Sequence, residues 1–370
     1  MRRAASGAGR RWAVVVALVG VLVALPPVIG ALPASDADVS ATDLRDAALA
    51  SVAQPFSGYA ESAGGLTLPV GSPRFSSVVD LFSDRTQMRV WWRSDTESRV
   101  DVVTAGGETS YRADPGGGWI WTYEDERATR DAREAFHLPI PPDLLPAPLG
   151  RRLLAEATDE ELSRTGAERI AGQDGLGVRV TPPAEASSVD HVDVWVDADS
   201  GLPLKVQLYG KDSDLAALDT RFLDLELTEP DRALIAFEPP DGARVSVSEE
   251  DGVLERARHA LAEEPLPDQL AGLSRRQVDG APEAVGLYGS GVTLLAVVPV
   301  PQGVAFDVAD GLRADPDSVE QDSGIRTAAG PLSIMVLNGR GGRAYLVTGT
   351  VTLDALGDAA PELGFPEEDE

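Results

Sequence analysis

The amino-acid sequence predicts a mainly β protein of the α+β class. Runs of β-branched and aromatic residues recur along most of the chain, and clusters of Gly, Ser, Asp and Pro separate them. Helical periodicity appears only in short segments, such as 43–53 and 353–363. Several strand pairs are joined by short glycine-containing turns, which is typical of antiparallel hairpins.

Composition limits the function classes. The chain has 370 residues, enough for two domains or one large one, and 43% of them are hydrophobic. Asp and Glu number 60 against 32 Lys and Arg, which gives a net charge of -28. Such a surface repels nucleic acid, so we expect no nucleic-acid partner. Cysteine is absent, which excludes disulfides, thiol catalysis and Cys–zinc sites.

Residues 1–35 are predicted to be a signal anchor or a signal peptide. Arginines precede an uncharged apolar run over residues 12–32, which at about 1.5 Å per residue spans a hydrocarbon core of about 30 Å. The arginines favour the cytoplasmic side, so the rest of the chain lies outside the cytoplasmic membrane. Leu32 fits the small-residue rule for cleavage after Ala34 poorly, which favours a retained anchor.

The exported part begins with a short helix and continues as strands. Leu44, Ala48 and Val52 repeat at helical spacing, which predicts an amphipathic helix over 43–53 that Pro55 ends. Alternation and β-branched residues then predict strands over 77–82, 87–92, 98–105, 109–113 and 119–123.

Two segments that follow are expected to interrupt the strands. Residues 124–136 are charged and helix-prone. Residues 138–150 contain many prolines, which cannot occupy a helix interior or a central strand, so we expect an ordered loop.

Strands resume over 162–227. A hairpin is predicted around the turn 171–175, and a second over 191–210 around 199–201. In the second, three valines alternate with Asp193, Trp195 and Asp197. The last strands of this part are expected over 220–230 and 235–245.

An acidic, linker-like stretch over 246–283 predicts a domain boundary near residue 250. Beyond it, hairpins are predicted around 289–291 and 338–342, with a closing helix over 353–363. These elements form a small domain over 258–360, and residues 361–370 are expected to be a disordered acidic tail.

No catalytic or metal site is predicted. The histidines His137, His191 and His259 stand far apart, and no nucleophile motif accompanies them. Asp197-x-Asp199-x-Gly201 resembles the start of a calcium loop, but Leu208 takes the place of its closing glutamate. We therefore expect a protein without enzymatic activity and without a cofactor.

The aromatic residues are the candidates for a binding site. Trp119, Trp121 and Tyr123 alternate on one strand and so share a face, and Trp91 and Trp195 lie on other predicted strands. Such rings bury about 150–250 Å² each and most often form core. They can equally line an apolar cavity on a strongly curved sheet. Periodicity alone favours core packing.

Four motifs, in this order and spacing, resemble a known fold. They are "GGGWIWTYE", "ERIAGQDGLGVRVTP", "VDVWVDADSGLPLKVQLYG" and "FEPPDGARV". Together they resemble the LolA-like lipoprotein-carrier fold, shared by LppX-like proteins and the N-terminal domain of the MucB/RseB sigma-factor regulators, over residues 43–247. "YGSGVTLLAVVPVP" and "AYLVTGTV" resemble the small C-terminal domain of the MucB/RseB proteins, which LolA-type carriers lack.

The resemblance implies a strongly curved, unclosed antiparallel β-barrel wrapped round helices, with a small α+β C-terminal domain. It implies that lipid or acyl chains enter a cavity, with Trp91, Trp119, Trp121, Tyr123 and Trp195 as candidate lining residues. It further implies a membrane-bound anti-sigma factor as partner. The predicted function is a membrane-associated, extracytoplasmic sensor of apolar ligands that regulates such a partner. A lipid or lipoprotein carrier of the LolA/LppX type is the alternative.

Overall fold

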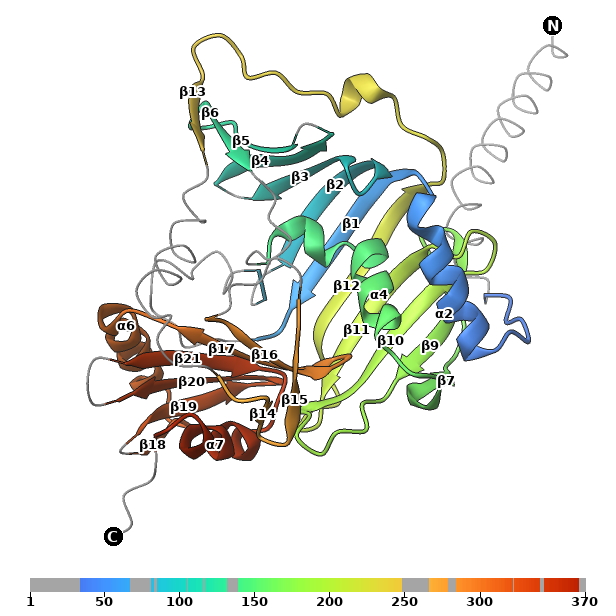
Figure 1. Cartoon of the computed structure of the whole chain (residues 1–370). Helices are drawn as coiled ribbons and strands as arrows, with labels where there is room; N and C mark the ends of the chain where they lie inside the picture. The colour runs from blue at the N-terminus through green and yellow to red at the C-terminus, as the bar shows by residue number, and fades with distance from the viewer. Residues whose placement is uncertain are drawn as a thin grey trace, which may run out of the picture.

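The computed structural model describes residues 34–66, 81–82, 85–104, 106–115, 117–131, 139–247, 266–278, 284–321, 323–339 and 343–365. Their strands form two sheets (Figure 1). The larger sheet does not close into a barrel, since its path ends at two different edge strands in the described chain. The prediction of a mainly β protein with an unclosed sheet is therefore confirmed.

Within the described residues the larger sheet has thirteen strands. Along the sheet they are β13 (Arg244–Val247), β6 (Arg127–Asp131), β5 (Gly117–Thr122), β4 (Gly107–Asp114), β3 (Glu97–Thr104), β2 (Arg85–Ser94), β1 (Phe56–Gly64), β12 (Ala216–Glu226), β11 (Pro203–Gly210), β10 (Val189–Asp197), β9 (Gln173–Val180) and β7 (Leu162–Arg164), with β8 (Glu168–Ile170) paired to β9. Every described pair is antiparallel except β13 with β6, which is parallel.

Two helices pack on one face of this sheet, which we call the inner face. The helix α2 (Ala41–Ala50) lies on β7 and β9, and α4 (Pro146–Ala155) lies on β11 and β12 and against α2 (Figure 1). The side chain of Ser40 caps α2 by accepting a hydrogen bond from the Asp43 amide. Short 3-10 turns stand at η1 (Ser51–Ala53), η2 (Pro141–Leu144), η3 (Asp159–Glu161) and η4 (Arg232–Leu234).

The main core lies between the inner face and these helices. Val194 of β10 is fully buried, and so are Leu204 of β11 and Leu154 of α4. The backbone of α4 approaches closely because Gly150 has no side chain. A Cβ there would stand 2.6 Å from the Cβ of Pro203 and 3.2 Å from Val194 Cγ1. Tight contact at this position therefore depends on glycine.

Two predictions between β5 and α4 are wrong. Residues 127–131 of the helix-prone stretch form β6, because pairing with β5 and β13 outweighs a weak local preference. Residues 146–150 of the expected loop open α4, with Pro146 as its first residue. Proline fits there because amides of the first helical turn have no acceptor within the helix.

Other boundaries also differ from expectation. Leu81 and Phe82 are helical, not part of a strand, and residues 77–80 lie outside the described ones. The last strand is expected over 235–245, but only residues 244–245 are part of a strand, at the start of β13. The tail over 361–370 is ordered at its start, because Phe365 is buried and packs edge-on against Tyr345 at 5.8 Å.

The second sheet has eight strands in the described chain. In order they are β14 (Gln269–Leu270), β15 (Leu273–Arg276), β16 (Gly286–Ser290), β17 (Thr293–Pro299), β21 (Ala344–Gly349), β20 (Leu332–Asn338), β19 (Gly324–Ala329) and β18 (Val319–Gln321). The helices α6 (Gln302–Arg313) and α7 (Leu353–Glu362) join separate buried clusters built on alternate residues of β20. The predicted hairpins correspond to β16–β17 and β20–β21.

The two sheets meet through backbone and side-chain contacts. Ser187 bridges to Val351, and the Thr352 amide donates to the Ala186 carbonyl at 2.8 Å. The predicted boundary near 250 and the apolar run over 12–32 lie outside the described residues. In the part that is described, no helix is long and apolar enough to cross a membrane.

Truncation of the core should be costly. We expect Leu204→Ala to lower the free energy of unfolding by about 2–5 kcal/mol, because it opens a cavity under α4. Leu215→Ala is the matched control, since Leu215 is 79% exposed, and should change stability by less than about 0.5 kcal/mol. Urea unfolding of both variants checks this, and equal losses would contradict the described core.

Candidate functional site

The pairing register assigns the predicted aromatic residues to faces of the larger sheet. Directly paired residues of antiparallel strands point to the same face. Phe222 of β12 packs on Phe56 of β1, which stacks on Trp92 at 5.8 Å. All three belong to the cluster that α2 and α4 cover, so Trp92 points to the inner face and its neighbour Trp91 to the outer face.

One row of paired residues crosses the outer face. It consists of Trp91 on β2, Arg99 on β3, Arg112 on β4, Trp119 on β5 and Arg130 on β6. The row contains two aromatic rings and three guanidinium groups, with Arg99 and Arg112 side by side. Arg99 lies 4.7 Å from the ring centre of Trp91, and Arg130 lies 4.9 Å from that of Trp119, both within cation–π range.

Trp119, Trp121 and Tyr123 come together, as their spacing predicts. The ring of Phe237 lies 5.9 Å from Trp119 and 5.8 Å from Trp121, and Tyr123 stands edge-on to Trp121 at 5.7 Å. Trp121 is buried, whereas Tyr123 is 40% exposed. This cluster is on the outer face, opposite to the face that α2 and α4 cover. Ligand binding by them stays a prediction.

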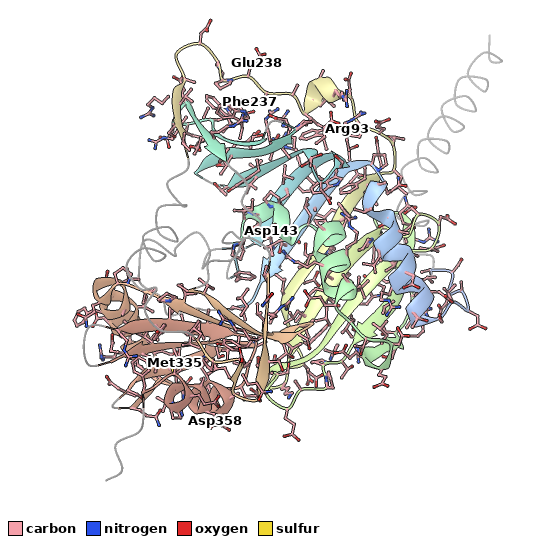
Figure 2. All side chains as sticks on the ribbon, in the orientation of Figure 1. Arg93, Asp143, Phe237, Glu238, Met335 and Asp358 are labelled. Atoms are coloured by element: carbon pink, nitrogen blue, oxygen red, sulfur yellow. The ribbon has the colours of Figure 1, made fainter. Side chains whose placement is uncertain are left out.

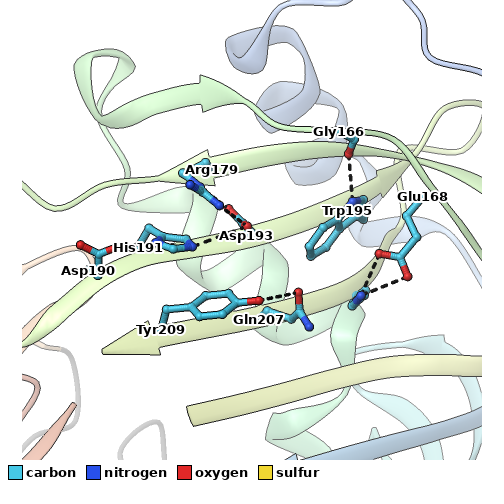
Figure 3. Close-up of polar contacts among 10 residues, drawn as sticks. Gly166, Glu168, Arg179, Asp190, His191, Asp193, Trp195, Gln207 and Tyr209 are labelled. Atoms are coloured by element: carbon cyan, nitrogen blue, oxygen red, sulfur yellow. Dashed lines mark hydrogen bonds and ion pairs between the residues drawn. The ribbon is translucent and has the colours of Figure 1, made fainter. Parts of the chain in front are cut away.

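Trp195 lies apart from the other four residues. Val194 contacts α4, so the next side chain on β10 points to the outer face. The indole Nε1 donates to the Gly166 carbonyl at 3.0 Å, and Lys205 Nζ lies 4.5 Å from the ring centre (Figure 3). Lys205 pairs in turn with Glu168 at 2.8 Å. The Trp195 ring thus makes a cation–π contact with the lysine of this ion pair.

Paired polar side chains continue along this half of the outer face. Arg179 holds the buried Asp193 through two bonds of 2.7 Å, and His191 stacks on Tyr209 at 4.5 Å (Figure 3). Burial raises the pKa of Tyr209, so its hydroxyl stays protonated and donates to Gln207 at 3.1 Å. These contacts connect β9, β10 and β11 across the sheet.

The calcium-like motif forms a turn. Asp197 Oδ2 accepts hydrogen bonds from the amide of Ser200 at 2.9 Å and from its hydroxyl at 2.6 Å. Searching the described residues finds no group of three or more His, Asp or Glu side chains that could hold a metal ion.

The inner face continues beyond α2 and α4 towards β6. A row of paired residues there contains the buried Val90 and Val100 and then the half-buried Tyr111 and Ile120. Figure 1 shows α2 and α4 over the other half of the sheet. Tyr111 and Ile120 are therefore inner-face candidates that sequence analysis missed. Alternation reveals which residues share a face, but not which face the helices cover.

The arginines and Phe237 were also missed. Arg99 and Arg112 become neighbours only through the β3–β4 register. Phe237 stands in a stretch with Pro and Glu that carries no periodic signal. Phe237 packs against Trp119 and Trp121 although more than one hundred residues separate them in the sequence. A local sequence pattern carries no information about such a distant contact.

Comparisons with known proteins give structural neighbours only. No protein-family model and no curated protein matches the sequence. The chain is similar to MucB in complex with MucA(peri), with 19% identity, 89% of this chain and 100% of that chain covered, and a TM-score of 0.48. It is also similar to a Pseudomonas aeruginosa MucA/MucB complex, with 19% identity, 86% of this chain and 96% of that chain covered, and a TM-score of 0.47.

A LolA-superfamily protein from Nitrosomonas europaea is also similar, at 12% identity, covering 54% of this chain and 98% of that chain with a TM-score of 0.24. Both groups that the sequence motifs resemble are thus among the solved structures similar to this chain. These identities and TM-scores assign no function.

The buried ion pair beneath the outer aromatic row should matter for stability. Asp101 is buried and binds Arg99 through bonds of 2.8 and 2.6 Å. We expect Asp101→Ala to cost about 3–5 kcal/mol of unfolding free energy, because Arg99 loses its counter-ion in a largely buried position. Glu108→Ala, which breaks the exposed pair with Arg89, should cost less than about 1 kcal/mol. Thermal and urea unfolding test both, and similar costs would contradict the expectation.

Proposed function

We propose that this protein is an exported, non-enzymatic binding protein that takes an apolar ligand on its inner face and communicates occupancy to its second sheet. The observation that carries the proposal is the position of α4. This helix packs on the inner face of the larger sheet, and its C-terminal end contacts the second sheet. A ligand that displaces α4 would therefore disturb the contact between the sheets.

The contact is made by one carboxylate. Glu156, the C-cap residue of α4, accepts from Arg276 Nη2 at 2.6 Å with one oxygen. Its other oxygen accepts from the Gly291 amide at 3.1 Å. Arg276 belongs to β15 and Gly291 to the turn between β16 and β17. Because a ten-residue helix spans about 15 Å, α4 can transmit a movement at its start to this carboxylate.

The proposed ligand position adjoins the start of α4. Tyr111 and Ile120 are half-buried on the inner face, on strands that α2 and α4 leave to other parts of the chain. The turn η2 leads directly into α4, and its Leu144 carbonyl accepts from the hydroxyl of Thr220 on the inner face at 2.6 Å. Tyr111 and Ile120 offer apolar contact to an acyl chain, while Arg127 of β6, paired with Thr122, lies on the same face.

A membrane-bound anti-sigma-factor-type partner is the regulatory part of the proposal. The sequence resemblance over 43–247 and 258–360 supports it, and anchoring through residues 12–32 would keep both proteins at one membrane. Ligand binding would release the partner only if the two arrangements of the sheets bind ligand with different affinity. A lipid or lipoprotein carrier is the second candidate, supported by the carrier-like motifs. Co-purification of a single-span anti-sigma factor would distinguish the regulator from the carrier.

The face that binds the apolar ligand can be identified directly. In a fluorescence titration with cis-parinaric acid, we expect Ile120→Asn to weaken binding at least about tenfold, a loss of about 1.4 kcal/mol, because it places an amide against the acyl chain. Trp119→Ala, on the outer face of the same strand, should leave affinity within about twofold. The opposite pattern, with both variants folded by circular dichroism, would move the site to the outer face.

Coupling through α4 is tested separately. On adding cis-parinaric acid, we expect hydrogen exchange of amides in 286–292 to change in the wild-type protein. In Glu156→Gln the change should be absent while affinity for the probe is retained, because the variant loses the charged bond to Arg276. An unchanged exchange response in Glu156→Gln would refute coupling through this side chain.

A further inference from the structure

A segment on the outer face holds the observations that go furthest beyond this function. Residues 229–243, here called the strap, lead from β12 across the outer face to β13 at the far edge of the sheet (Figure 1). Figure 2 places Arg93 and Phe237 near the two ends of the crossing. The strap is fully described, and η4 is its one regular element before β13.

Arginines of the sheet bind the main chain of the strap. Arg93 Nη1 donates to the Pro230 carbonyl at 2.7 Å, and Arg99 Nη1 donates to the Leu234 carbonyl at 3.1 Å. Arg112 Nη1 donates to the carbonyls of Ile235 at 2.9 Å and Ala236 at 3.0 Å. Arginines from β2, β3 and β4 thus donate hydrogen bonds to strap carbonyls, which have no partner strand to pair with in the described chain. Contacts to carbonyls do not depend on side-chain identity.

Charged and apolar side chains both anchor the strap. Glu229 pairs with Arg93, and Arg232 pairs with Glu97 at 2.7 Å. Ile235 is buried, and the ring of Phe237 packs against Trp119 and Trp121 with the Arg112 guanidinium 5.0 Å from its centre. Leu234, the last residue of η4, is 43% exposed. Attachment therefore combines sequence-tolerant carbonyl contacts with specificity for an aliphatic and an aromatic residue two positions apart.

The sheet beneath the strap does not need it for its core. In the described chain, the cluster under α2 and α4 contains no residue of 229–243. The outer face carries its own polar contacts, with Arg99 on Asp101 and Arg112 Nε on the Ser110 hydroxyl at 3.0 Å. Burial lowers the pKa of Arg112, with the charge of Arg99 acting in the same direction, so water on this face would favour its charged form. Because the core does not include the strap, the strap can open locally while the sheet stays folded.

We propose that the outer face of β2–β5 is a binding surface for a partner polypeptide that forms one helical turn, as the strap does at η4, followed by an aliphatic residue and an aromatic residue two positions apart. The strap is its resident occupant and yields to the partner. Because β13 follows the strap and pairs with the edge of β6, release also frees that edge for strand addition. This surface is opposite the proposed apolar ligand, so the two proposals stand or fall separately.

The test supplies the strap sequence in trans. A fluorescent peptide with the sequence of residues 229–240, EPDRALIAFEPP, is titrated by anisotropy against the full exported chain. We expect Ile235→Ala/Phe237→Ala, which releases the resident strap, to bind at least about tenfold more tightly than wild type. Adding Arg112→Gln should abolish the gain, and a peptide with alanine in place of its phenylalanine should not bind. Leu215→Ala is the control and should behave as wild type.

Two results would overturn the proposal. One is a folded double variant, with a native circular dichroism spectrum, that binds no peptide. The other is binding that Arg112→Gln does not weaken. If the double variant does not fold, hydrogen exchange of the wild type decides. The amides of Leu234, Ile235 and Ala236, bonded within the strap, should then exchange at least about a hundredfold faster than those of β2–β4. Equal protection would show that the strap does not open.

Discussion

The packing of α4 on the inner face is the interaction on which the rest of the structure depends. Gly150 lets the helix backbone touch Pro203 and Val194. A hydrogen bond from Thr220 to the Leu144 carbonyl fixes the turn that leads into the helix, and Glu156 fixes the end of the helix to the second sheet. One helix therefore closes the main core and joins the two sheets. Under the proposed function, a movement of α4 in the core would reach the contact between the sheets through Glu156.

Different interactions stabilise the two faces of the larger sheet. The inner face is apolar, and its stability comes from removing that surface from water under α2 and α4. The outer face instead places guanidinium groups against aromatic rings and pairs charges within the sheet, as Arg99 does with Asp101. Its covering strap contributes few buried side chains. The proposed exchange of the strap would therefore leave the core under α2 and α4 closed.

This division suggests one framework for binding at two places. An apolar ligand would bind on the inner face near Tyr111 and Ile120 and would displace α4. A partner polypeptide with one helical turn would act on the opposite face, where Arg93, Arg99 and Arg112 already bind main-chain carbonyls. The strands between the faces are shared, so each site could influence the other through the twist of the sheet. Nothing in either site requires a reactive side chain.

The sequence by itself determined the features that are local. Alternation and glycine turns predicted the β10–β11, β16–β17 and β20–β21 hairpins, because a hairpin is specified by adjacent residues. The spacing of Trp119, Trp121 and Tyr123 likewise placed them on one face. Only the tertiary structure decided that this face is the outer one, that residues 127–131 are a strand, and that Phe237 meets Trp121. Those outcomes depend on pairing and packing between distant segments, and a local pattern holds no information about its distant partner.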